Sequence, residues 1–295
     1  MILPKISIVT PSYNQGRFLG ETIQSILDQN YANLEYVIID GGSNDCSVDI
    51  IKAYEKQLHY WTSEKDEGHG HALNKGFSHT TGEIMAWINS DDKYTPWSLK
   101  VVAEIFAQFS NVMWIVGFNS WWNSMGVMTS ASRVPKNIYD FLLGNYTWIQ
   151  QESVFWRREL WEKAGGYINQ DYKLLVDGEL WTRFFLHEEL YSVDCILSGY
   201  RVHPENRAKE YSRKCLLEMD NAISVMKQKC TDHVLRTYKR LRILRGMKKI
   251  PVLKYMPISY LGRNFVFPEA FRNACYKNIT YKDEMWTERS LQFYV

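Results

Sequence analysis

The sequence predicts an α/β fold with a mostly parallel, Rossmann-like central sheet and a helical C-terminal extension. In the N-terminal half, short apolar runs rich in β-branched residues alternate with segments whose apolar residues recur at helical spacing. Alternation of strand and helix is the pattern of βαβ units, whose strands pair in parallel. The chain has 295 residues, 45% of them hydrophobic and 23% charged, which is enough for one large domain with an appendage.

The expected strands of the N-terminal half each end in polar or turn-forming residues. The strands are 5–10, 34–40, 59–62 and 84–89, and the helices between them run near 19–27, 48–54 and 72–76. Carboxyl ends of parallel strands meet at one edge of a sheet, where ligands of open α/β folds bind. We therefore expect the residues after the first, second and fourth strands to form one site.

The fourth strand ends in Ser90, Asp91 and Asp92, which we take as the centre of this site. Two adjacent carboxylates repel each other unless a cation lies beside them. A divalent metal is the simplest such cation, because Mg²⁺ prefers hard oxygen ligands and is commonly shared with substrate phosphates. The alternative is that the two acids only begin a turn or cap the helix after Pro96.

The second strand ends in Asp40, followed by Gly41 and Gly42. A carboxylate here can accept hydrogen bonds from a base or ribose, and backbone N–H groups near the glycines can approach a ligand closely. The alternative role for Asp40 is a turn or a helix cap. The chain lacks both G-x-G-x-x-G and G-x-x-x-x-G-K-[ST], which disfavours dinucleotide-binding and nucleoside-triphosphatase folds.

Several motifs, in register over the first hundred residues, resemble those of family 2 glycosyltransferases. They are T-P-S-Y-N at 10–14, I-D-G-G-S-N-D at 39–45, S-E-K-D-E-G at 63–68, A-L-N-K-G at 72–76, G-E-I at 82–84 and W-I-N-S-D-D at 87–92. The resemblance implies a glycosyltransferase A fold, a nucleotide-sugar donor, Mg²⁺ or Mn²⁺, and inversion at the anomeric carbon.

The resemblance also assigns residues to the donor by position. The residues expected to bind the donor are Pro11, Tyr13, Asp40, Gly42, Asp66, Lys75, Ser90 and Asp91. Pro11, Tyr13 and Asp40 would hold the nucleobase and ribose, and Asp66 and Lys75 would lie near the nucleotide and diphosphate.

The same resemblance implies a metal motif at Ser90, Asp91 and Asp92, with Asp92 as the direct ligand. His203, which ends a short strand, would complete the metal shell or contact the diphosphate; a structural histidine is the alternative. His69 and His71 stand where similar proteins often have polar or acidic residues, so the resemblance assigns them no role; we expect a solvated loop there, and a metal role is the alternative.

Asp177 and Glu179 open a predicted helix that continues through Phe185. Acids in a first turn favour the helix dipole, which is the structural alternative. In a transferase, the acceptor hydroxyl loses a proton as it attacks, and a carboxylate within hydrogen-bond reach is the usual base. Similar proteins carry an acidic pair here. Asp177 is therefore the candidate base and Glu179 a secondary substrate-binding residue.

The middle of the chain holds two further features. Val112–Gly117 is a predicted strand, and the adjacent rings of Trp121 and Trp122 after it cannot all face one side. Core packing is the default for either ring, and stacking on a sugar is the alternative. In similar enzymes, a stretch like Gln150-Gln151-Glu152 lies under the acceptor or sugar pocket.

The C-terminal third is basic. Between Lys227 and Arg263 there are eleven Lys and Arg residues, and Asp232 is the only acid, so the net charge of +2 hides a basic extension. We divide the chain into a catalytic domain at 1–210 and this extension at 211–295. It can lie on an anionic membrane surface, at about 1 kcal/mol per basic residue, or be a solvated helix that covers the catalytic domain. No nucleic-acid motif accompanies the charge.

The five cysteines are scattered, without a C-x-x-C pair, which argues against a thiolate metal site and a disulfide framework. The N-terminus enters a strand without a signal peptide, and no apolar run reaches the roughly 20 residues of a membrane span. We expect a cytoplasmic protein, with a peripheral position at the inner face of the membrane if the extension binds lipid.

Together these features predict an inverting, metal-dependent transferase that moves a sugar from a nucleotide-diphosphate donor, such as a UDP-sugar, to a hydroxyl of a saccharide or lipid-linked saccharide. Surface polysaccharide or lipopolysaccharide assembly is the expected setting. The rivals are an inactive carbohydrate- or membrane-binding module on the same fold and a two-carboxylate glycoside hydrolase.

Overall fold

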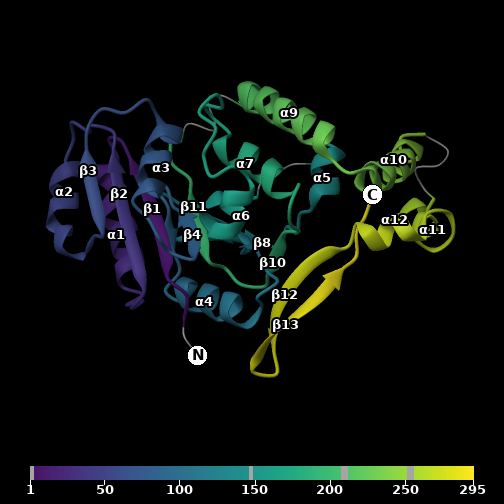
Figure 1. The fold of residues 1–295 in the computed structure, drawn as a ribbon, viewed down its shortest axis with the longest axis horizontal. Coiled ribbons are helices and arrows are strands. Elements are labelled where there is room, and N and C mark those ends of the chain that lie inside the picture. The colour runs from purple at the N-terminus through teal and green to yellow at the C-terminus, as the bar shows by residue number, and fades with distance from the viewer. Residues whose placement is uncertain (1–2, 146–148, 207–211, 251–255) are drawn as a thin grey trace.

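The computed structural model describes residues 3–145, 149–206, 212–250 and 256–295 (Figure 1). A nine-stranded sheet has the order β13-β12-β10-β6-β9-β4-β1-β2-β3, and a four-stranded sheet has the order β5-β11-β7-β8. The strands of the large sheet are β1 (Ile6–Ser12), β2 (Leu34–Asp40), β3 (Tyr60–Ser63), β4 (Ile84–Trp87), β6 (Trp114–Val116), β9 (Val154–Arg157), β10 (Tyr191–Val193), β12 (Tyr276–Lys282) and β13 (Met285–Leu291).

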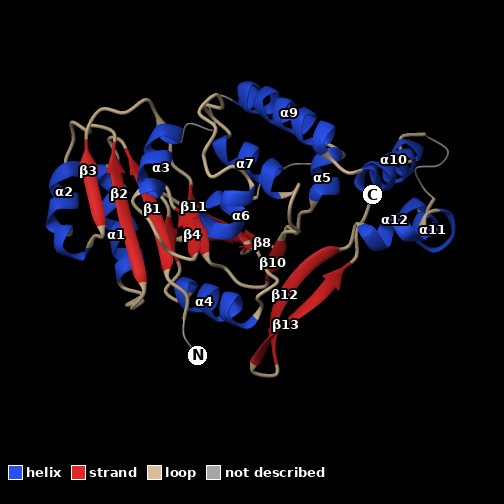
Figure 2. Cartoon of the chain, viewed as in Figure 1, coloured by secondary structure: helices blue, strands red, loops and turns tan. Residues whose placement is uncertain are grey.

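The small sheet and the helices complete the fold (Figure 2). The small sheet contains β5 (Lys93–Tyr94), β7 (Asn119–Trp122), β8 (Met128–Ser132) and β11 (Ser198–Arg201). The α-helices are α1 (Gly16–Leu27), α2 (Ser47–Ala53), α3 (His69–Ser78), α4 (Ser98–Gln108), α5 (Ile138–Leu142), α6 (Arg158–Lys163), α7 (Val176–Phe184), α9 (Ser212–Lys229), α10 (Asp232–Met247), α11 (Ile258–Leu261) and α12 (Pro268–Asn273).

The expected parallel sheet of the N-terminal half is present. Strands β3, β2, β1 and β4 are neighbours and all pair in parallel. Strands β1, β2 and β4 are almost wholly buried, which fits a sheet with helices on both faces, whereas the edge strand β3 is half-buried. Gly76 of α3 lies so close to Val9 and Ile39 that a Cβ there would meet both side chains, so α3 packs directly on β1 and β2.

Strand β9 runs antiparallel between β4 and β6, which positions a segment that matters for the site. Ile84 of β4 pairs with Arg157, and Val116 of β6 pairs with Val154. The start of β9 therefore lies at the same edge as the carboxyl ends of β4 and β6. Accordingly, the 3₁₀ turn Gln151–Ser153, which directly precedes β9, lies at the edge where the acidic motif emerges from β4.

A cluster of buried tryptophans joins β4 to helix α7. The rings of Trp87 and Trp181 are stacked with centroids 5.7 Å apart, and the ring of Trp156 lies 5.5 Å from Trp87 in an edge contact. Such pairs contribute about 0.5–1.5 kcal/mol beyond their buried area. Trp181 lies one helical turn after Asp177, so this packing fixes the start of α7 relative to the end of β4.

The C-terminal extension differs in part from the expectation. It contains the predicted helices, but β12 and β13 form a hairpin that joins the large sheet, because β12 pairs in parallel with β10. The hairpin turns at Asp283 and Glu284, which have φ angles of 51° and 63°. Such a turn is usually signalled by Asn-Gly or Asp-Gly, and that signal is missing here. The division of the chain at residue 210 stays a prediction.

The predicted strand at Val112–Gly117 corresponds to β6, and the two tryptophans after it lie in β7 of the small sheet. Trp122 is buried, and its ring occupies the space where a Cβ on Gly199 would be. Trp121 is only partly buried. Trp122 therefore has the core role, and stacking of Trp121 on a sugar stays a prediction.

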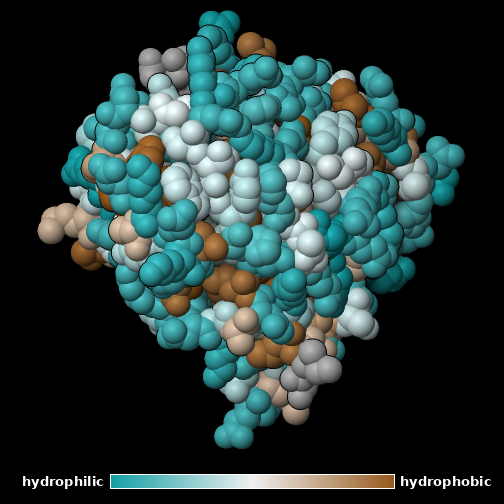
Figure 3. Space-filling view, turned by 60° about the vertical axis from the view of Figure 1, so that its left-hand side comes forward, coloured by the Kyte–Doolittle hydropathy of each residue, from teal (hydrophilic) through white to brown (hydrophobic). Residues whose placement is uncertain are grey.

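The surface seen in Figure 3 is largely hydrophilic, with apolar residues gathered in a small area low on that face. Across the described part of the chain, no helix combines the length and the apolar character that crossing a bilayer requires.

Candidate active site

The loops after β1 and β2 are joined by hydrogen bonds. The backbone N–H of Asn14 donates to the Ser43 hydroxyl at 2.8 Å, and the N–H of Asn44 donates to Oδ1 of Asn14 at 2.9 Å. Pro11 is buried in β1, whereas the ring of Tyr13 is 61% exposed close to this junction. An exposed aromatic ring at this edge of the sheet suits stacking on a nucleobase.

Asp40, at the end of β2, is fully buried. Its Oδ2 accepts hydrogen bonds from the backbone N–H groups of Gly42 and Ser43, at 3.2 and 2.9 Å. The hydroxyls of Ser43 and Ser63 donate to the same carboxylate at 2.6 and 2.7 Å. In this conformation Asp40 shapes the loop after β2, which is the turn role that the sequence left open. Its contact with a base or ribose stays a prediction.

The loop after β3 closes against the loop after β2. A Cβ on Gly41 would lie 2.8 Å from Oδ2 of Asp66, so this approach requires glycine. Gly42 has a φ of +79°, a conformation that side chains disfavour. Lys75 on α3 forms an ion pair with Glu64 of the same loop. The predicted donor-binding residues of the second and third strand ends are therefore close together.

The acidic motif lies on the turn between β4 and β5. Oδ2 of Asp91 and Nε2 of His203 are 2.9 Å apart, and Nε of Arg201 donates to the backbone carbonyl of Asp91 at 2.6 Å. Asp92 faces inward with 1% exposure, and its Oδ1 accepts a hydrogen bond from the backbone N–H of Arg201 at 2.7 Å. Ser90 is also buried. Asp91 thus contacts the histidine, while Asp92 anchors the turn to β11.

Glu152 lies in the same cluster; the resemblance placed its stretch under the acceptor or sugar pocket, but we gave this residue no role of its own. Its side chain is 3% exposed, and its Oε1 has no hydrogen-bond partner among the described residues. Burial raises the pKa of Glu152 to about 8, and the charges of Asp177 and Asp91 act in the same direction. The neighbouring Gln151 donates from Nε2 to the backbone carbonyl of Trp87 at 2.5 Å, which fixes this turn against β4.

The electrostatics show that the acids share one region. Burial raises the pKa of Asp92 well above its usual range, and the charges of Asp91 and Glu152 raise it further, against the N–H of Arg201. The charges of Asp177 and Asp91 likewise raise the pKa of Glu152. The acids of the β4 turn, the β9 turn and the start of α7 therefore converge at the carboxyl edge of the sheet.

Asp177 and Glu179 have different surroundings at the start of α7. The guanidinium of Arg183 binds both oxygens of Glu179, with Nε to Oε1 at 2.9 Å and Nη2 to Oε2 at 2.8 Å. Burial raises the pKa of Asp177 to about 6, although the N–H groups of the helix start oppose the shift. Among the described residues, no ion pair involves Asp177. Glu179 is therefore neutralised by a cation, whereas Asp177 is not, among the residues that the structure describes.

The expectation of a solvated loop at His69 and His71 is wrong. Both residues lie in the first turn of α3 and are partly buried. Nε2 of His69 lies 3.2 Å from Oδ1 of Asn89, the residue before the acidic motif. Gly68, with a φ of 109°, allows the chain to turn into the helix at this point. Helix α3 therefore connects the β3 loop with the β4 turn.

The donor set for a divalent metal is small. No group of three or more His, Cys, Asp or Glu residues suited to a metal ion occurs in the described ranges. Asp91 and His203 supply one oxygen and one nitrogen, 2.9 Å apart, and Nδ1 of His203 is buried without a hydrogen bond within the described structure. Two protein ligands fit a metal that takes its other ligands from substrate phosphates and water.

Comparison with known sequences agrees with this architecture. The model of the family "Glycosyl transferase family 2" matches residues 7–174, more than half of the chain. An uncharacterized glycosyltransferase of Mycobacterium tuberculosis is 28% identical over 203 residues, which are 67% of this chain and 75% of that protein. The putative teichuronic acid biosynthesis glycosyltransferase TuaG of Bacillus subtilis is 32% identical over 119 residues, which are 39% of this chain and 47% of TuaG.

Solved structures share the fold. Residues 1–349 of S. aureus TarS in complex with UDP-GlcNAc superpose with a TM-score of 0.58 at 12% identity, covering 99% of each chain. The mannosyltransferase PcManGT from Pyrobaculum calidifontis, in complex with GDP-Man and Mn²⁺, gives 0.54 at 16% identity, covering 93% of this chain and 74% of PcManGT. The fold is the glycosyltransferase A fold, and with more than half of its length matched by the family model, this chain belongs to glycosyl transferase family 2.

Proposed function

We propose that this transferase moves a sugar from a nucleotide-diphosphate donor, a UDP-sugar, to a hydroxyl of a saccharide or lipid-linked saccharide, with inversion at the anomeric carbon. The observation that carries the proposal is the convergence of Asp91, Glu152 and Asp177 beside the loops after β1 and β2. The complexes of TarS with UDP-GlcNAc and of PcManGT with GDP-Man support a nucleotide-sugar donor.

A divalent cation, Mg²⁺ or Mn²⁺, would be held by Asp91 and His203. When bound, it would offset the negative charge of the leaving nucleoside diphosphate. Our sequence prediction made Asp92 the direct ligand. Because Oδ1 of Asp92 accepts the Arg201 N–H, whereas Oδ2 of Asp91 lies 2.9 Å from Nε2 of His203, we now assign Asp92 to positioning of the turn and Asp91 to the metal. The Mn²⁺ in the PcManGT complex supports a metal in this fold.

Asp177 would act as the general base that takes the proton of the acceptor hydroxyl. A base with a pKa of about 6 is ionised at neutral pH and is still a better proton acceptor than an ordinary aspartate. Glu179 is held by Arg183 and would instead orient the start of α7. Inversion follows from a single displacement, in which the acceptor attacks the face of the sugar opposite the diphosphate.

The cellular role would be assembly of a surface polysaccharide or lipopolysaccharide, which the similarity to TuaG supports. The protein would act in the cytoplasm, with a peripheral position at the inner membrane face. The basic extension offers a surface for this. On α10, Arg236, Lys239, Arg242 and Ile243 are exposed, whereas Leu241 on the opposite face is buried.

Membrane binding by α10 can be tested directly. Reversing the charge of Arg236 and Lys239 to Glu should reduce co-sedimentation with phosphatidylglycerol vesicles, because each basic residue near an anionic surface contributes about 1 kcal/mol. The matched control reverses Lys52 and Lys56, which are exposed on the N-terminal domain. Equal binding by the two variants would leave α10 as a solvated helix.

The function itself is tested by screening nucleotide sugars for release of nucleoside diphosphate, with and without oligosaccharide acceptors. We expect one donor to be consumed, with a product of inverted anomeric configuration. Cleavage of a glycoside without any nucleotide sugar would instead favour the glycoside hydrolase. Binding of UDP with no turnover of any donor would favour an inactive binding module.

A further inference from the structure

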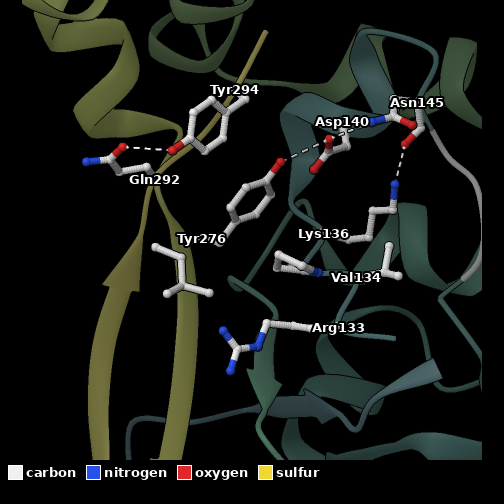
Figure 4. Close-up of a pocket in the computed structure, with 10 residues that line it drawn as sticks. Arg133, Val134, Lys136, Asp140, Asn145, Tyr276, Gln292 and Tyr294 are labelled. Carbon is white, nitrogen blue, oxygen red and sulfur yellow. Dashed lines mark hydrogen bonds between the residues drawn. The ribbon is translucent and has the colours of Figure 1, made fainter. Parts of the chain in front are cut away.

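A cavity lies among segments that are distant in sequence from the loops after β1, β2 and β3. It has a volume of about 510 Å³, within the range of small-molecule sites, and none of the predicted site residues lines it. Its lining residues are Arg133, Val134, Pro135, Lys136, Asp140, Asn145, Tyr276, Leu291, Gln292 and Tyr294. Figure 4 shows the segment that enters α5 on one side and the C-terminal strands and tail on the other.

Lys136 is the buried cation among the residues that line this cavity. Its side chain is buried, with 4% exposure, and Nζ donates to the backbone carbonyl of Asn145 at 3.0 Å. An ammonium group has three donors, and this is the one hydrogen bond of Nζ within the described residues. A buried cation with unused donors favours an oxygen-rich, anionic ligand, because an uncompensated buried charge is costly.

Asp140, the acid that lines the cavity, does not satisfy this ammonium. Its carboxylate accepts hydrogen bonds from the N–H of Asn137 at 3.1 Å, from Nδ2 of Asn145 at 3.2 Å and from the hydroxyl of Tyr276 at 3.3 Å. Figure 4 shows the carboxylate directed toward Tyr276 and Asn145. No ion pair joins Asp140 to Lys136 in the parts of the chain that are described. Asp140 and Lys136 still attract each other through their charges, and the positive character of the cavity comes from two lining cations, Lys136 and Arg133, against this one lining acid.

The remaining walls suit a sugar. Tyr276 is buried, and Tyr294 is 65% exposed, with its hydroxyl donating to Oε1 of Gln292 at 3.0 Å. Aromatic rings next to amide and hydroxyl groups bind the apolar faces and hydroxyls of saccharides. Arg133 adds a second cation at the rim; its side chain is 41% exposed while it pairs with Asp194.

The cavity is linked to the reaction centre but separate from it. The ring of Phe141 in α5 lies 4.9 Å from the ring of Phe185, which directly follows α7. Asp177 lies at the other end of α7, about 12 Å away along the helix axis at 1.5 Å per residue. The packing of α5 on the end of α7 therefore connects one wall of the cavity to the helix that carries Asp177.

We propose that this cavity binds an anionic sugar of the acceptor chain, one that carries a carboxylate or phosphate, at a distance from the hydroxyl that is glycosylated. The inference depends on the proposed function only where it makes the bound sugar part of the acceptor. The binding chemistry of the cavity, a buried ammonium beside two tyrosines, is independent of turnover.

The test is calorimetric titration of the full chain with trigalacturonate and with maltotriose, a neutral trisaccharide of similar length. We expect trigalacturonate to bind and maltotriose to bind at least tenfold more weakly. Lys136→Met should weaken trigalacturonate roughly tenfold or more, since a hydrogen bond to a charged group is lost. Lys52→Met, which removes an exposed charge elsewhere, should leave trigalacturonate affinity unchanged.

Tyr294→Ala provides a second variant that does not disturb the core, because Tyr294 is exposed. It should also weaken trigalacturonate. Equal affinity for the two trisaccharides, or unchanged affinity in a folded Lys136→Met and in Tyr294→Ala, would overturn the inference. If trigalacturonate binds through Lys136 but no donor is consumed, the cavity stands and the proposed function fails. Donor consumption without preference for trigalacturonate gives the reverse result.

Discussion

The proposed donor edge, made of the loops after β1, β2 and β3, and the proposed reaction centre, made of Asp91, Glu152 and Asp177, both hold partly or fully buried carboxylates. They differ in the hydrogen bonds that those carboxylates receive. Asp40 is surrounded by N–H and O–H donors. Glu152 has an oxygen with no partner in the described structure.

The pKa values follow this difference. Asp45 at the donor edge is exposed; desolvation would raise its pKa, but the hydrogen bonds from Ser47 and Gly16 outweigh this, and the pKa lies below its usual value. At the reaction centre burial dominates, and it raises the pKa of Glu152 to about 8 and that of Asp177 to about 6. Hydrogen bonds therefore favour the ionised form of Asp45, whereas burial opposes the ionised forms of Glu152 and Asp177 and so lowers the stability of the fold at neutral pH.

The largest expected effect is loss of the base. Asp177→Asn should reduce kcat by roughly 10²–10⁴-fold, the usual contribution of a general base. UDP affinity, measured by calorimetry, should stay unchanged, because the donor edge is intact. Glu179→Gln is the matched control, since Glu179 is paired with Arg183, and it should reduce kcat much less. Equal losses in the two variants would remove the distinction between the two acids.

The second effect concerns the metal. EDTA should stop turnover, and Mg²⁺ or Mn²⁺ should restore it. Asp91→Asn should raise the Mn²⁺ concentration needed for half activity at least tenfold, because it removes a proposed direct ligand. Asp92→Asn tests our earlier prediction, in which Asp92 binds the metal. If Asp92→Asn shifts the Mn²⁺ requirement more than Asp91→Asn does, Asp92 is the ligand and our assignment of Asp91 is wrong.

These comparisons also separate what the sequence could predict from what it could not. The donor edge is local: each motif directly follows an apolar strand, and parallel pairing alone brings Thr10-Pro11, Asp40 and Asp91 to one edge. Glu152 reaches the centre because β9 inserts antiparallel between β4 and β6, and the sequence carries no signal of that pairing. The hairpin at 276–291 was missed because its turn lacks glycine and asparagine.

The different environments of neighbouring acids were equally invisible in the sequence. Asp91 and Asp92 are adjacent, and only the position of β11 decides which carboxylate meets His203 and which accepts the Arg201 N–H. In the same way, the Arg183 that neutralises Glu179 was read as part of a helix, without its partner. Residue type, spacing and the family resemblance predicted which residues belong to the site, and tertiary packing determines which partner each acid contacts.

The third effect is on the pH dependence of kcat/KM, which should change by about tenfold per pH unit below pH 6. A general base must be ionised, and the pKa of Asp177 is raised to about 6, so kcat/KM should rise with pH up to about 6 and then level off. An aspartate without this shift would give a plateau already near pH 4. A profile measured between pH 4.5 and 8 with saturating metal therefore distinguishes a buried base from a carboxylate of the donor-edge kind.

The smallest effect, on stability, tests the comparison most directly. The folded pKa of Glu152 is about 8 and its ordinary value is 4.5, so its ionisation opposes folding increasingly as pH rises from 4.5 through 8. Glu152→Gln removes that charge and should stabilise the protein at pH 9, with no gain at pH 4. Asp40→Asn should instead destabilise the protein, because the N–H and O–H groups around Asp40 lose a carboxylate acceptor. Thermal unfolding of both variants at the two pH values decides the matter. If Glu152→Gln destabilises the protein as Asp40→Asn does, then Glu152 also accepts stabilising hydrogen bonds. The two regions would then not differ in how their carboxylates are bound.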